Sequence, residues 1–324
     1  MSLWNEKIKP MLAEISEPFD DENFLFEIKF DGTRTIAYIN KNKKEVRFLN
    51  RRGFWFEARY PEMKDLWKDV DAEKIILDGE LVIFKEGKPD FYLLAEREHV
   101  GEKTRAEILS RINPATYVVF DILHLNGKDL VDLPLIERKK ILEEKVRESE
   151  RVLLSVYVIG DGKKFFEEVK AKGLEGIMAK RLDSTYQVGK RSKDWLKVKV
   201  LNSLDCIICG YTLGEGKREK YFGALLLGAW HEGKLRYLGR VGTGWEEKDL
   251  EEITAMLKKI ETGKNPFDVF GEEPVILEKV KWVKPKLVCE VKFMELTEDL
   301  KLRAPSFQRL RKDKLPEECS LETL

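Results

Sequence analysis

The feature that most constrains the fold is a series of strand-like segments with no helix between them. The segments span residues 24–30, 34–40 and 44–50, and only short connections join them. Their β-branched and aromatic side chains, bounded by turn residues, are typical of β-strands. Strands joined this closely pair in an antiparallel way, so the sequence predicts antiparallel sheets and excludes a purely βαβ fold.

The chain changes texture near residue 200. Before it, we expect further strands at 75–84, 116–124, 152–158, 175–180 and 194–200, and helices at 61–70, 104–112, 135–149 and 162–172. After it, we expect glycine-punctuated strands at 205–213, 221–230 and 234–241, a helix at 246–260, and strands near 275–283 and 287–296. A handful of short strands with one helix is typical of a small barrel of the OB type.

These elements predict an α+β protein with two domains, at residues 1–201 and 202–324, joined by a short hinge near Leu201. The length of 324 residues gives each domain enough chain for a core of its own.

The charges of the chain balance, because Lys and Arg number 59 and Asp and Glu also number 59. Binding to nucleic acid must therefore come from local basic clusters. The charged fraction of 36%, rich in Lys and Glu, is typical of thermophile ion-pair networks. We recognise no amino-terminal signal peptide, and the longest apolar run, 221–230, is too short to span a bilayer. We expect an intracellular protein.

The four cysteines do not predict a zinc site. Cys206 and Cys209 are three residues apart on an expected strand, so their side chains point to opposite faces. Cys289 and Cys319 have no CxxC partner. We expect reduced thiols that are buried or free.

One lysine, Lys29, lies inside the apolar run FLFEIKF and is followed by Asp31, Gly32 and Arg34. A lysine amine attacks only when it is neutral, and burial beside other cations favours the neutral form. The residues that follow offer a polar anchor, a close backbone approach and a guanidinium fork for phosphate. The run predicts a nucleophilic lysine beside a phosphate site.

Three further segments suit a nucleotide, although each has an ordinary explanation. Arg51 in NRRG suits phosphate, but a solvated hairpin tip has the same composition. Asp78 and Glu80 in LDGELV suit a ribose hydroxyl or a divalent cation, but an Asp-Gly turn looks alike. Phe120 in YVVFDIL suits stacking on a nucleobase or a place in the core.

Two later strands carry charged side chains. Glu175 is a candidate metal ligand, and Lys180 is an odd number of residues away, so the two share a face only if the strand bends at Gly176. Lys197 and Lys199 share one face and focus positive charge, although an exposed alternating strand has the same pattern.

Two basic segments complete the set. Lys190, Arg191 and Lys193 are nearly unopposed by acids and suit a nucleic-acid backbone, with salt-sensitive contacts. Near the carboxyl end, the segment RAPSFQRLRKDK contains Arg311 and Lys314, and its Pro, Phe and Asp residues favour an ordered structure over a simple basic tail.

Taken in order, these segments resemble the motifs of the covalent nucleotidyltransferases, the superfamily of DNA ligases, RNA ligases and messenger-RNA capping enzymes. The matching motifs are EIKFDGTR, NRRG, LDGELV, YVVFDIL, EGIMAKR, DWLKVK and RAPSFQRLRKDK. The resemblance is strongest to ATP-dependent DNA ligases, in particular the ligase module of end-joining ligase D. The segments CGYTLGEGKREKYFGALLLG and WVKPKLVCEVKFMELTEDLKLRAPSF read like that subfamily.

The resemblance implies an adenylation domain of antiparallel sheets with flanking helices, followed by an OB-fold β-barrel. It makes Lys29 the nucleophile that forms lysyl-AMP. It implies that ATP is bound by Glu27, Asp31, Gly32, Arg34, Arg51, Glu80, Phe120, Lys180, Lys197, Lys199, Arg311, Asp313 and Lys314. It makes Glu80 and Glu175 the metal ligands and assigns DNA contacts to Arg52, Lys190, Arg191 and Lys193.

The implied activity is sealing of 5′-phosphate/3′-hydroxyl nicks in duplex DNA with ATP and Mg²⁺ or Mn²⁺. An RNA ligase or a capping-type guanylyltransferase with the same lysine chemistry is the first alternative, and a non-catalytic OB-fold nucleic-acid binder is the second. Expected partners are nicked double-stranded DNA and an end-binding repair protein or a sliding clamp.

We expect a monomer in the cytoplasm, associated with the nucleoid and not with a membrane. Only about 28 residues precede Lys29, so we expect no large amino-terminal DNA-binding domain.

Overall fold

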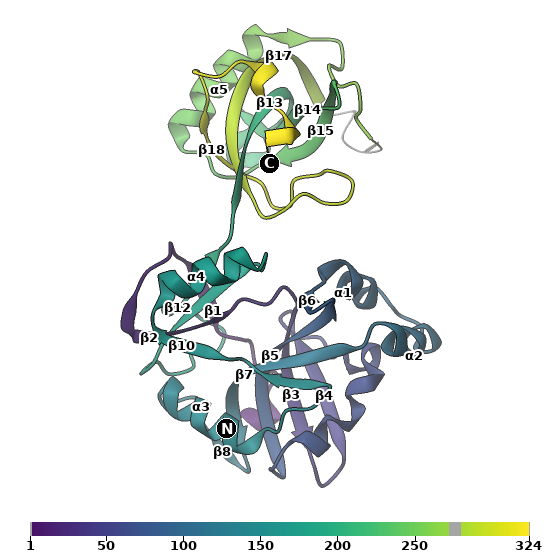
Figure 1. Ribbon diagram of the computed structural model, residues 1–324, viewed down its shortest axis with the longest axis vertical. Coiled ribbons are helices and arrows are strands. Elements are labelled where there is room, and N and C mark those ends of the chain that lie inside the picture. Colours follow the sequence, from purple (N-terminus) through teal and green to yellow (C-terminus); the bar gives the residue numbers. More distant parts are fainter. Residues whose placement is uncertain (1, 272–279, 324) are drawn as a thin grey trace. The chain divides into compact units, whose positions relative to one another are not determined.

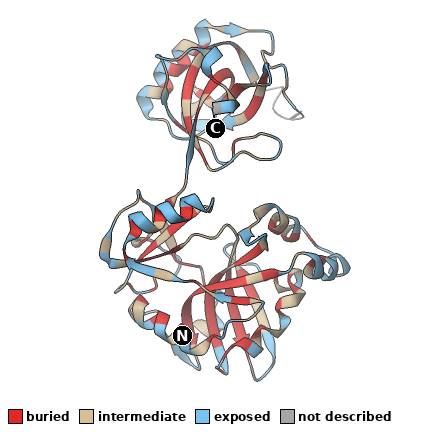
Figure 2. Ribbon diagram, in the orientation of Figure 1, coloured by how far each residue is buried: buried red, intermediate tan, exposed pale blue. Residues whose placement is uncertain are grey.

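The computed structural model describes residues 2–271 and 280–323. The chain divides into two compact units, Met1–Val200 and Leu201–Leu324 (Figure 1). Each unit has its own buried core, visible as the red segments of Figure 2.

The strand expected at 24–30 is β2, Asp21–Ile28, and it lies in a different sheet from the two strands that follow it, so the expected pairing of these neighbours is wrong for β2 and β3. The other two closely spaced strands, β3 and β4, pair with each other in the larger sheet of the first unit. Its order is β4-β3-β5-β7-β8, with β6 beside β5 and β9 beside β7. Only β9 pairs in parallel; the other neighbours are antiparallel, as expected. The strands are β3 Thr33–Asn40, β4 Glu45–Asn50, β5 Lys74–Lys85, β6 Lys88–Pro89, β7 Ala115–Leu125, β8 Lys128–Asp129 and β9 Val152–Leu154.

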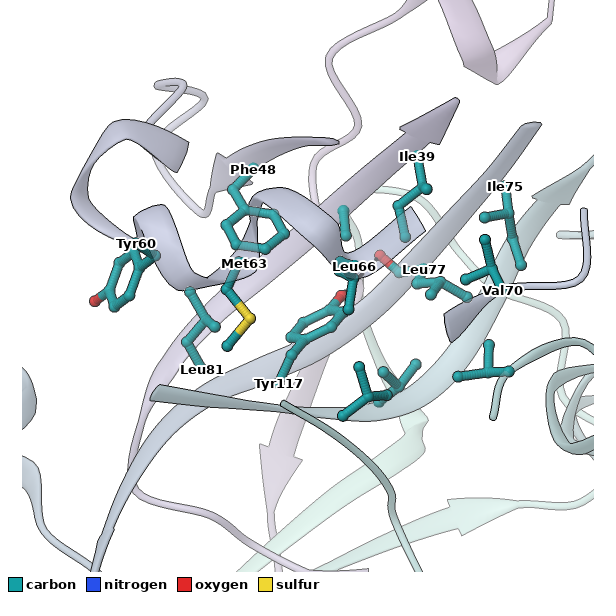
Figure 3. Close-up of a cluster of buried hydrophobic side chains, with 14 of the residues drawn as sticks. Ile39, Phe48, Tyr60, Met63, Leu66, Val70, Ile75, Leu77, Leu81 and Tyr117 are labelled. Carbon is teal, nitrogen blue, oxygen red and sulfur yellow. Dashed lines mark hydrogen bonds between the residues drawn. The ribbon is translucent and has the colours of Figure 1, made fainter. Parts of the chain in front are cut away.

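A core cluster lies on one face of this sheet. Inward-facing side chains such as Phe48, Leu77 and Tyr117 pack against Met63 and Leu66 of the 3₁₀ helix η3, Pro61–Asp69 (Figure 3). The expected helix at 61–70 is therefore present in 3₁₀ form.

The second sheet of this unit has the order β1-β12-β11-β2-β10. Its strands are β1 Leu12–Ile15, β2 Asp21–Ile28, β10 Tyr157–Gly160, β11 Gly176–Arg181 and β12 Arg191–Lys199. β1 runs parallel to β12, and the other pairs are antiparallel. Helix α4, Gly162–Ala171, covers one face through Phe166, which packs with Phe26 and Ile177.

Three further helices flank the larger sheet. They are α1 Phe91–Glu98, α2 Lys103–Ile112 and α3 Leu135–Lys145, and α3 contacts β7. Two expectations need correction. The helix expected to reach residue 149 ends at Lys145, and the strand expected at 152–158 is two strands in different sheets, β9 and β10. The helix α1 and the strand β1 were not expected.

The second unit is built on a six-stranded sheet with the order β15-β14-β13-β17-β16 and β18 beside β17. Its elements are β13 Asn202–Leu213, β14 Phe222–His231, β15 Lys234–Val241, α5 Glu247–Lys259, β16 Glu261–Thr262, β17 Val280–Phe293 and β18 Ser306–Leu310. Residues 280–283 and 287–293 of the two expected late strands form the single strand β17, while 275–279 lie outside the described residues.

Short 3₁₀ helices complete the chain at Leu3–Asn5, Glu57–Arg59, Gly216–Arg218, Pro316–Glu318 and Leu321–Thr323. Within the described ranges, no helix has the length and apolar character needed to cross a membrane.

The four cysteines are buried, free thiols. Cys206 and Cys209 belong to different buried clusters, so the expectation that they face opposite ways is confirmed. In the part of the chain that the structure describes, no three His, Cys, Asp or Glu side chains are grouped to hold a metal ion.

Candidate active site

Strands from both sheets of the first unit line a pocket of about 300 Å³. It brings together expected site residues that are scattered along the sequence: Glu27, Lys29, Arg34, Arg51, Glu80, Phe120, Lys180, Arg191, Lys197 and Lys199. Its other walls are Met11, Leu12, Ala13, Ile28, Phe30, Met178 and Trp195. The shared face of Lys197 and Lys199 is confirmed, because Leu196 and Val198 pack on the opposite, helix-covered side.

Lys29 directly follows β2 and reaches a carboxylate. Its Nζ donates to Glu175 Oε2 at 2.5 Å, and Lys199 Nζ lies 3.6 Å from the other oxygen of Glu175. The Lys29 side chain is 21% exposed. A carboxylate, that of Glu175, therefore stands between the Lys29 amine and the neighbouring cation Lys199.

Gly176 produces the bend that this geometry requires. Its φ is +145°, and a Cβ at this position would lie 2.1 Å from the carbonyl oxygen of Val198. Only glycine tolerates such a close approach. Glu175 therefore reaches the pocket residue Lys29 while Lys180 also lines the pocket, although the two are an odd number of positions apart.

Arg34 of β3 is held by a buried carboxylate. Its Nε and Nη2 donate to the two oxygens of Asp78 at 2.5 and 2.6 Å. Tyr186 also donates to Asp78, at 2.5 Å. Arg34 lies 4.6 Å from the centre of the Phe120 ring. Asp78 therefore fixes the guanidinium and is not itself part of the pocket lining.

A buried ionic triad forms another wall. Glu27 accepts hydrogen bonds from Lys180 at 2.5 Å and from Lys139, and all three side chains are about 2% exposed. Burial alone would raise the pKa of Glu27, but the two ammonium groups hold it below its usual value. Burial and the Lys139 charge lower the pKa of Lys180 to about 8, against the opposing effect of Glu27.

Two aromatic rings hold Lys180 in place. Its Nζ lies 4.0 Å from the centre of the Phe120 ring and 4.3 Å from that of Trp195. Such contacts are attractive because the faces of aromatic rings are electronegative. Phe120 is 9% exposed and lines the pocket, so it is both a core residue and a pocket wall.

The two carboxylates Glu80 and Glu175 suit a divalent cation. Burial raises the pKa of Glu80 to about 7, and the nearby cations Arg34 and Lys29 offset only part of that rise. Mg²⁺ is usually bound by one or two carboxylates together with substrate phosphates and water. Carboxylates that line or adjoin the same lysine pocket fit that requirement.

Some expected residues lie elsewhere. Asp31 and Gly32 are not among the described residues that line the pocket. Gly32 packs tightly, because a Cβ there would lie 2.4 Å from the carbonyl oxygen of Leu81. Arg52, Lys190 and Lys193 are exposed outside the pocket, whereas Arg191 lines it and donates to the carbonyl oxygen of Ala13.

The carboxyl-terminal motif forms a separate ionic cluster in the second unit. Arg311 donates to both oxygens of Asp205 at 2.8 and 2.9 Å and to Asp313 at 2.8 Å. Lys314 lies 3.2 Å from Asp205. The Arg311 guanidinium lowers the pKa of Asp313 to about 2. Arg311 and Lys314 line a cavity of about 230 Å³.

Family models match nearly the whole chain. The ATP dependent DNA ligase domain matches residues 7–199, and the ATP dependent DNA ligase C terminal region matches residues 218–314. The chain belongs to the ATP-dependent DNA ligase family. The expected fold class, α+β with an adenylation domain and an OB-fold, and the expected family are confirmed.

Similar proteins agree with this family. The multifunctional non-homologous end joining protein LigD of Mycolicibacterium smegmatis is 36% identical over 98% of this chain, which spans 40% of the length of that relative. The crystal structure of the ligase domain of Mycobacterium tuberculosis LigD is 32% identical with a TM-score of 0.55, covering 98% of this chain and 99% of that domain. A mycobacterial DNA ligase D complexed with ATP and MES is 31% identical with a TM-score of 0.56, at the same coverages of 98% and 99%.

The sequence patterns did not predict several residues that line the pocket or hold its charged side chains, nor the partner of Arg311 in the second unit. Lys139 belongs to a helical run of basic residues that reads as a solvated face, and Asp205 and Tyr186 lie outside the obvious charged patterns. Trp195 and Met178 lie within motifs that were noticed for their charges. The period-2 pattern of β12 provided a signal for Trp195, because Trp195, Lys197 and Lys199 share one face.

Proposed function

We propose that this chain is an ATP-dependent ligase that seals nicks in duplex DNA through a lysyl-AMP intermediate. The observation that carries the proposal is the position of Lys29. Its amine enters a nucleotide-sized pocket whose other walls carry guanidinium, ammonium, carboxylate and aromatic groups. Those are the groups that a triphosphate and a purine require.

In the first step, Lys29 Nζ attacks the α-phosphate of ATP, the bond between lysine and AMP forms, and pyrophosphate leaves. Lys197 and Lys199 stabilise the negative charge that develops on the phosphate. Glu175 orients the lysine amine through the 2.5 Å hydrogen bond and is close enough to take up its proton.

Other pocket residues bind the nucleotide. Phe120 packs against the base, and Glu27 and Lys180 meet its hydrogen-bonding edge. Arg34, Arg51 and Glu80 contact the ribose and phosphates, with Asp31 and Gly32 supporting the loop that follows Lys29. Mg²⁺ or Mn²⁺ would be held by Glu80 and Glu175 and would supply positive charge to the phosphates.

The second unit contributes the carboxyl-terminal motif. Arg311, Asp313 and Lys314 orient the leaving pyrophosphate, so the first unit, the adenylation domain 1–201, and the OB domain 202–324 must approach one another during this step.

Later steps require DNA. AMP passes from Lys29 to the 5′-phosphate at the nick, and the 3′-hydroxyl then displaces it. Arg52, Lys190, Arg191 and Lys193 supply backbone contacts, which we expect to weaken with salt. We propose nicked double-stranded DNA as the partner, with recruitment by an end-binding repair protein or a sliding clamp, and a monomeric enzyme that works in the cytoplasm at the nucleoid.

The proposal is tested with α-labelled ATP and GTP, followed by nicked DNA and nicked RNA. We expect covalent labelling by ATP and sealing of nicked DNA. Labelling by GTP alone would favour a capping-type enzyme, and sealing of RNA alone would favour an RNA ligase. Binding of DNA with no labelling by either nucleotide would favour a non-catalytic binder.

The variant Lys29→Ala separates the steps of the reaction. We expect it to abolish labelling and the sealing of ordinary nicks, because no other group forms the phosphoramidate. It should still seal a pre-adenylated nick slowly, since the last step needs no lysine nucleophile. If Lys29→Ala lost the sealing of pre-adenylated nicks as completely as the sealing of ordinary nicks, a role for Lys29 confined to the transfer of AMP would be contradicted.

A further inference from the structure

Glu27 is the only carboxylate among the described pocket residues whose two oxygens both contact buried lysines. An ionised carboxylate accepts hydrogen bonds and cannot donate them. Each of its oxygens offers about two lone-pair sites, so one site on each oxygen remains for a ligand after the lysines have bonded. The carboxylate therefore presents an acceptor to the pocket.

Lys139 stands behind this carboxylate. It is 2% exposed, and it is not among the described residues that line the pocket. Its neighbour Arg138 anchors helix α3 by donating to both oxygens of the buried Asp121 of β7 at 2.8 Å. This ion pair between Arg138 and Asp121 fixes the part of α3 from which Lys139 reaches Glu27. Any effect of Lys139 on a ligand therefore passes through Glu27.

The surroundings of Glu27 come from four elements. Lys139 of α3 and Lys180 of β11 contact it directly, and Tyr157 is its partner on β10. Asp121 of β7 acts on it through Lys180. Helix α4 packs against the other face of β2, through Phe26. Lys139 and Lys180 are therefore the groups that keep Glu27 ionised despite its burial.

Adenine and guanine differ in the group at position 6, which is the group that a hydrogen-bond acceptor such as Glu27 would contact. Adenine carries a 6-amino donor, whereas guanine carries a 6-oxo acceptor. A buried polar group left without a partner is costly, so a site built around an acceptor rejects a base that offers another acceptor.

We propose that Lys139 is a positioning residue for nucleotide choice: it holds Glu27 in the ionised, acceptor-only state that selects a 6-amino purine triphosphate over a 6-oxo one. The inference rests on the proposed function, because it concerns the nucleotide that labels Lys29. Removal of Lys139 leaves Glu27 with one cation, so the buried carboxyl takes up a proton more readily and becomes a donor to a 6-oxo group.

The test compares labelling of the full chain by ATP and by inosine triphosphate, which carries the 6-oxo group. For Lys139→Met we expect the ratio of the two kcat/KM values to fall about tenfold. Lys139→Arg keeps the charge and should restore the ratio. Lys140→Met changes the exposed neighbouring lysine on α3 and should leave the ratio unchanged.

The pH profile separates this role from a structural one. The wild-type ratio should stay level between about pH 6 and about pH 8, whereas the Lys139→Met ratio should fall further toward the acid end, where Glu27 is protonated. An equal loss of activity with both nucleotides, at a constant ratio, would overturn the proposal.

A double variant keeps the test decisive if Lys139→Met folds poorly. Glu27→Gln carries no charge, so adding Lys139→Met to it should not change the ratio further. If Lys139→Met lowered the ratio in the Glu27→Gln background as much as it does in the wild-type background, the inference would be overturned. A wild-type chain labelled by neither nucleotide would overturn the proposed function, and this inference with it.

Discussion

At the residue scale, the site consists of charges that bind one another before any ligand arrives. Lys29 bonds to Glu175, and Arg34 bonds to Asp78. Buried charges are stable only when paired, so these partners hold the side chains in position. The partners could not be read from the sequence, because Lys29 and Glu175 are 146 residues apart. The motif residues themselves were predictable, since charged side chains in apolar strands stand out.

The pKa of Lys180 gives a stability prediction at this scale. Its folded value is about 8, below the ordinary 10.5. Between these values the unfolded chain holds a proton that the folded protein has released, so stability rises with pH. Relative to Lys180→Met, the wild type should gain about 1.5 kcal/mol in free energy of unfolding from about pH 8 to about pH 9.5.

Denaturant unfolding at both pH values measures this difference. The exposed Lys140 provides the control, because the difference between wild type and Lys140→Met should not change with pH. If the difference in free energy of unfolding between wild type and Lys180→Met were also the same at both pH values, the folded protein would not favour loss of the Lys180 proton.

At the element scale, tertiary contacts decided what sequence patterns could not. Helix α3 ends at Lys145 because the following residues pair elsewhere: Arg147 donates to Asp69, and Val146 bridges to Val70. Strand β17 continues through Pro285, where a break was expected, because the register with β13 shifts there and the bulge accommodates proline. Helix α1 had a visible signal in its cap, since Asp90 accepts from the Leu93 amide.

The close packing of Gly176 at the start of β11 predicts how a substitution there affects stability. Gly176→Ala combines a strained φ with a clash against the backbone of Val198, so it should cost about 3 kcal/mol or more. Gly87 has φ of +78° in open space, so Gly87→Ala should cost only about 1 kcal/mol. Urea unfolding compares the two, and similar losses would contradict the close approach at Gly176.

At the scale of the whole molecule, the residues proposed to act in the reaction belong to two separate units. The nucleotide pocket belongs to the first unit, and the Arg311 cluster belongs to the second. The change in sequence texture near Val200 predicted this division because each unit has its own pattern of strands and core. The approach of the units during catalysis is a proposal that kinetics can test.

Arg311→Ala should slow labelling by ATP about 100-fold, because the leaving pyrophosphate loses a cation. Sealing of a pre-adenylated nick should change little. Lys312→Ala is the matched control, since Lys312 is exposed in the same segment and pairs with Glu252. Single-turnover labelling and sealing assays give both rates. A variant that lost only the final sealing step would contradict the role in pyrophosphate release.

The most direct measurement is a peptide map of the protein after exposure to ATP and magnesium. We expect one added AMP, on the peptide that contains Lys29, and none in the Lys29→Ala variant. An AMP group on another residue, or no AMP on protein that still seals nicks, would contradict it.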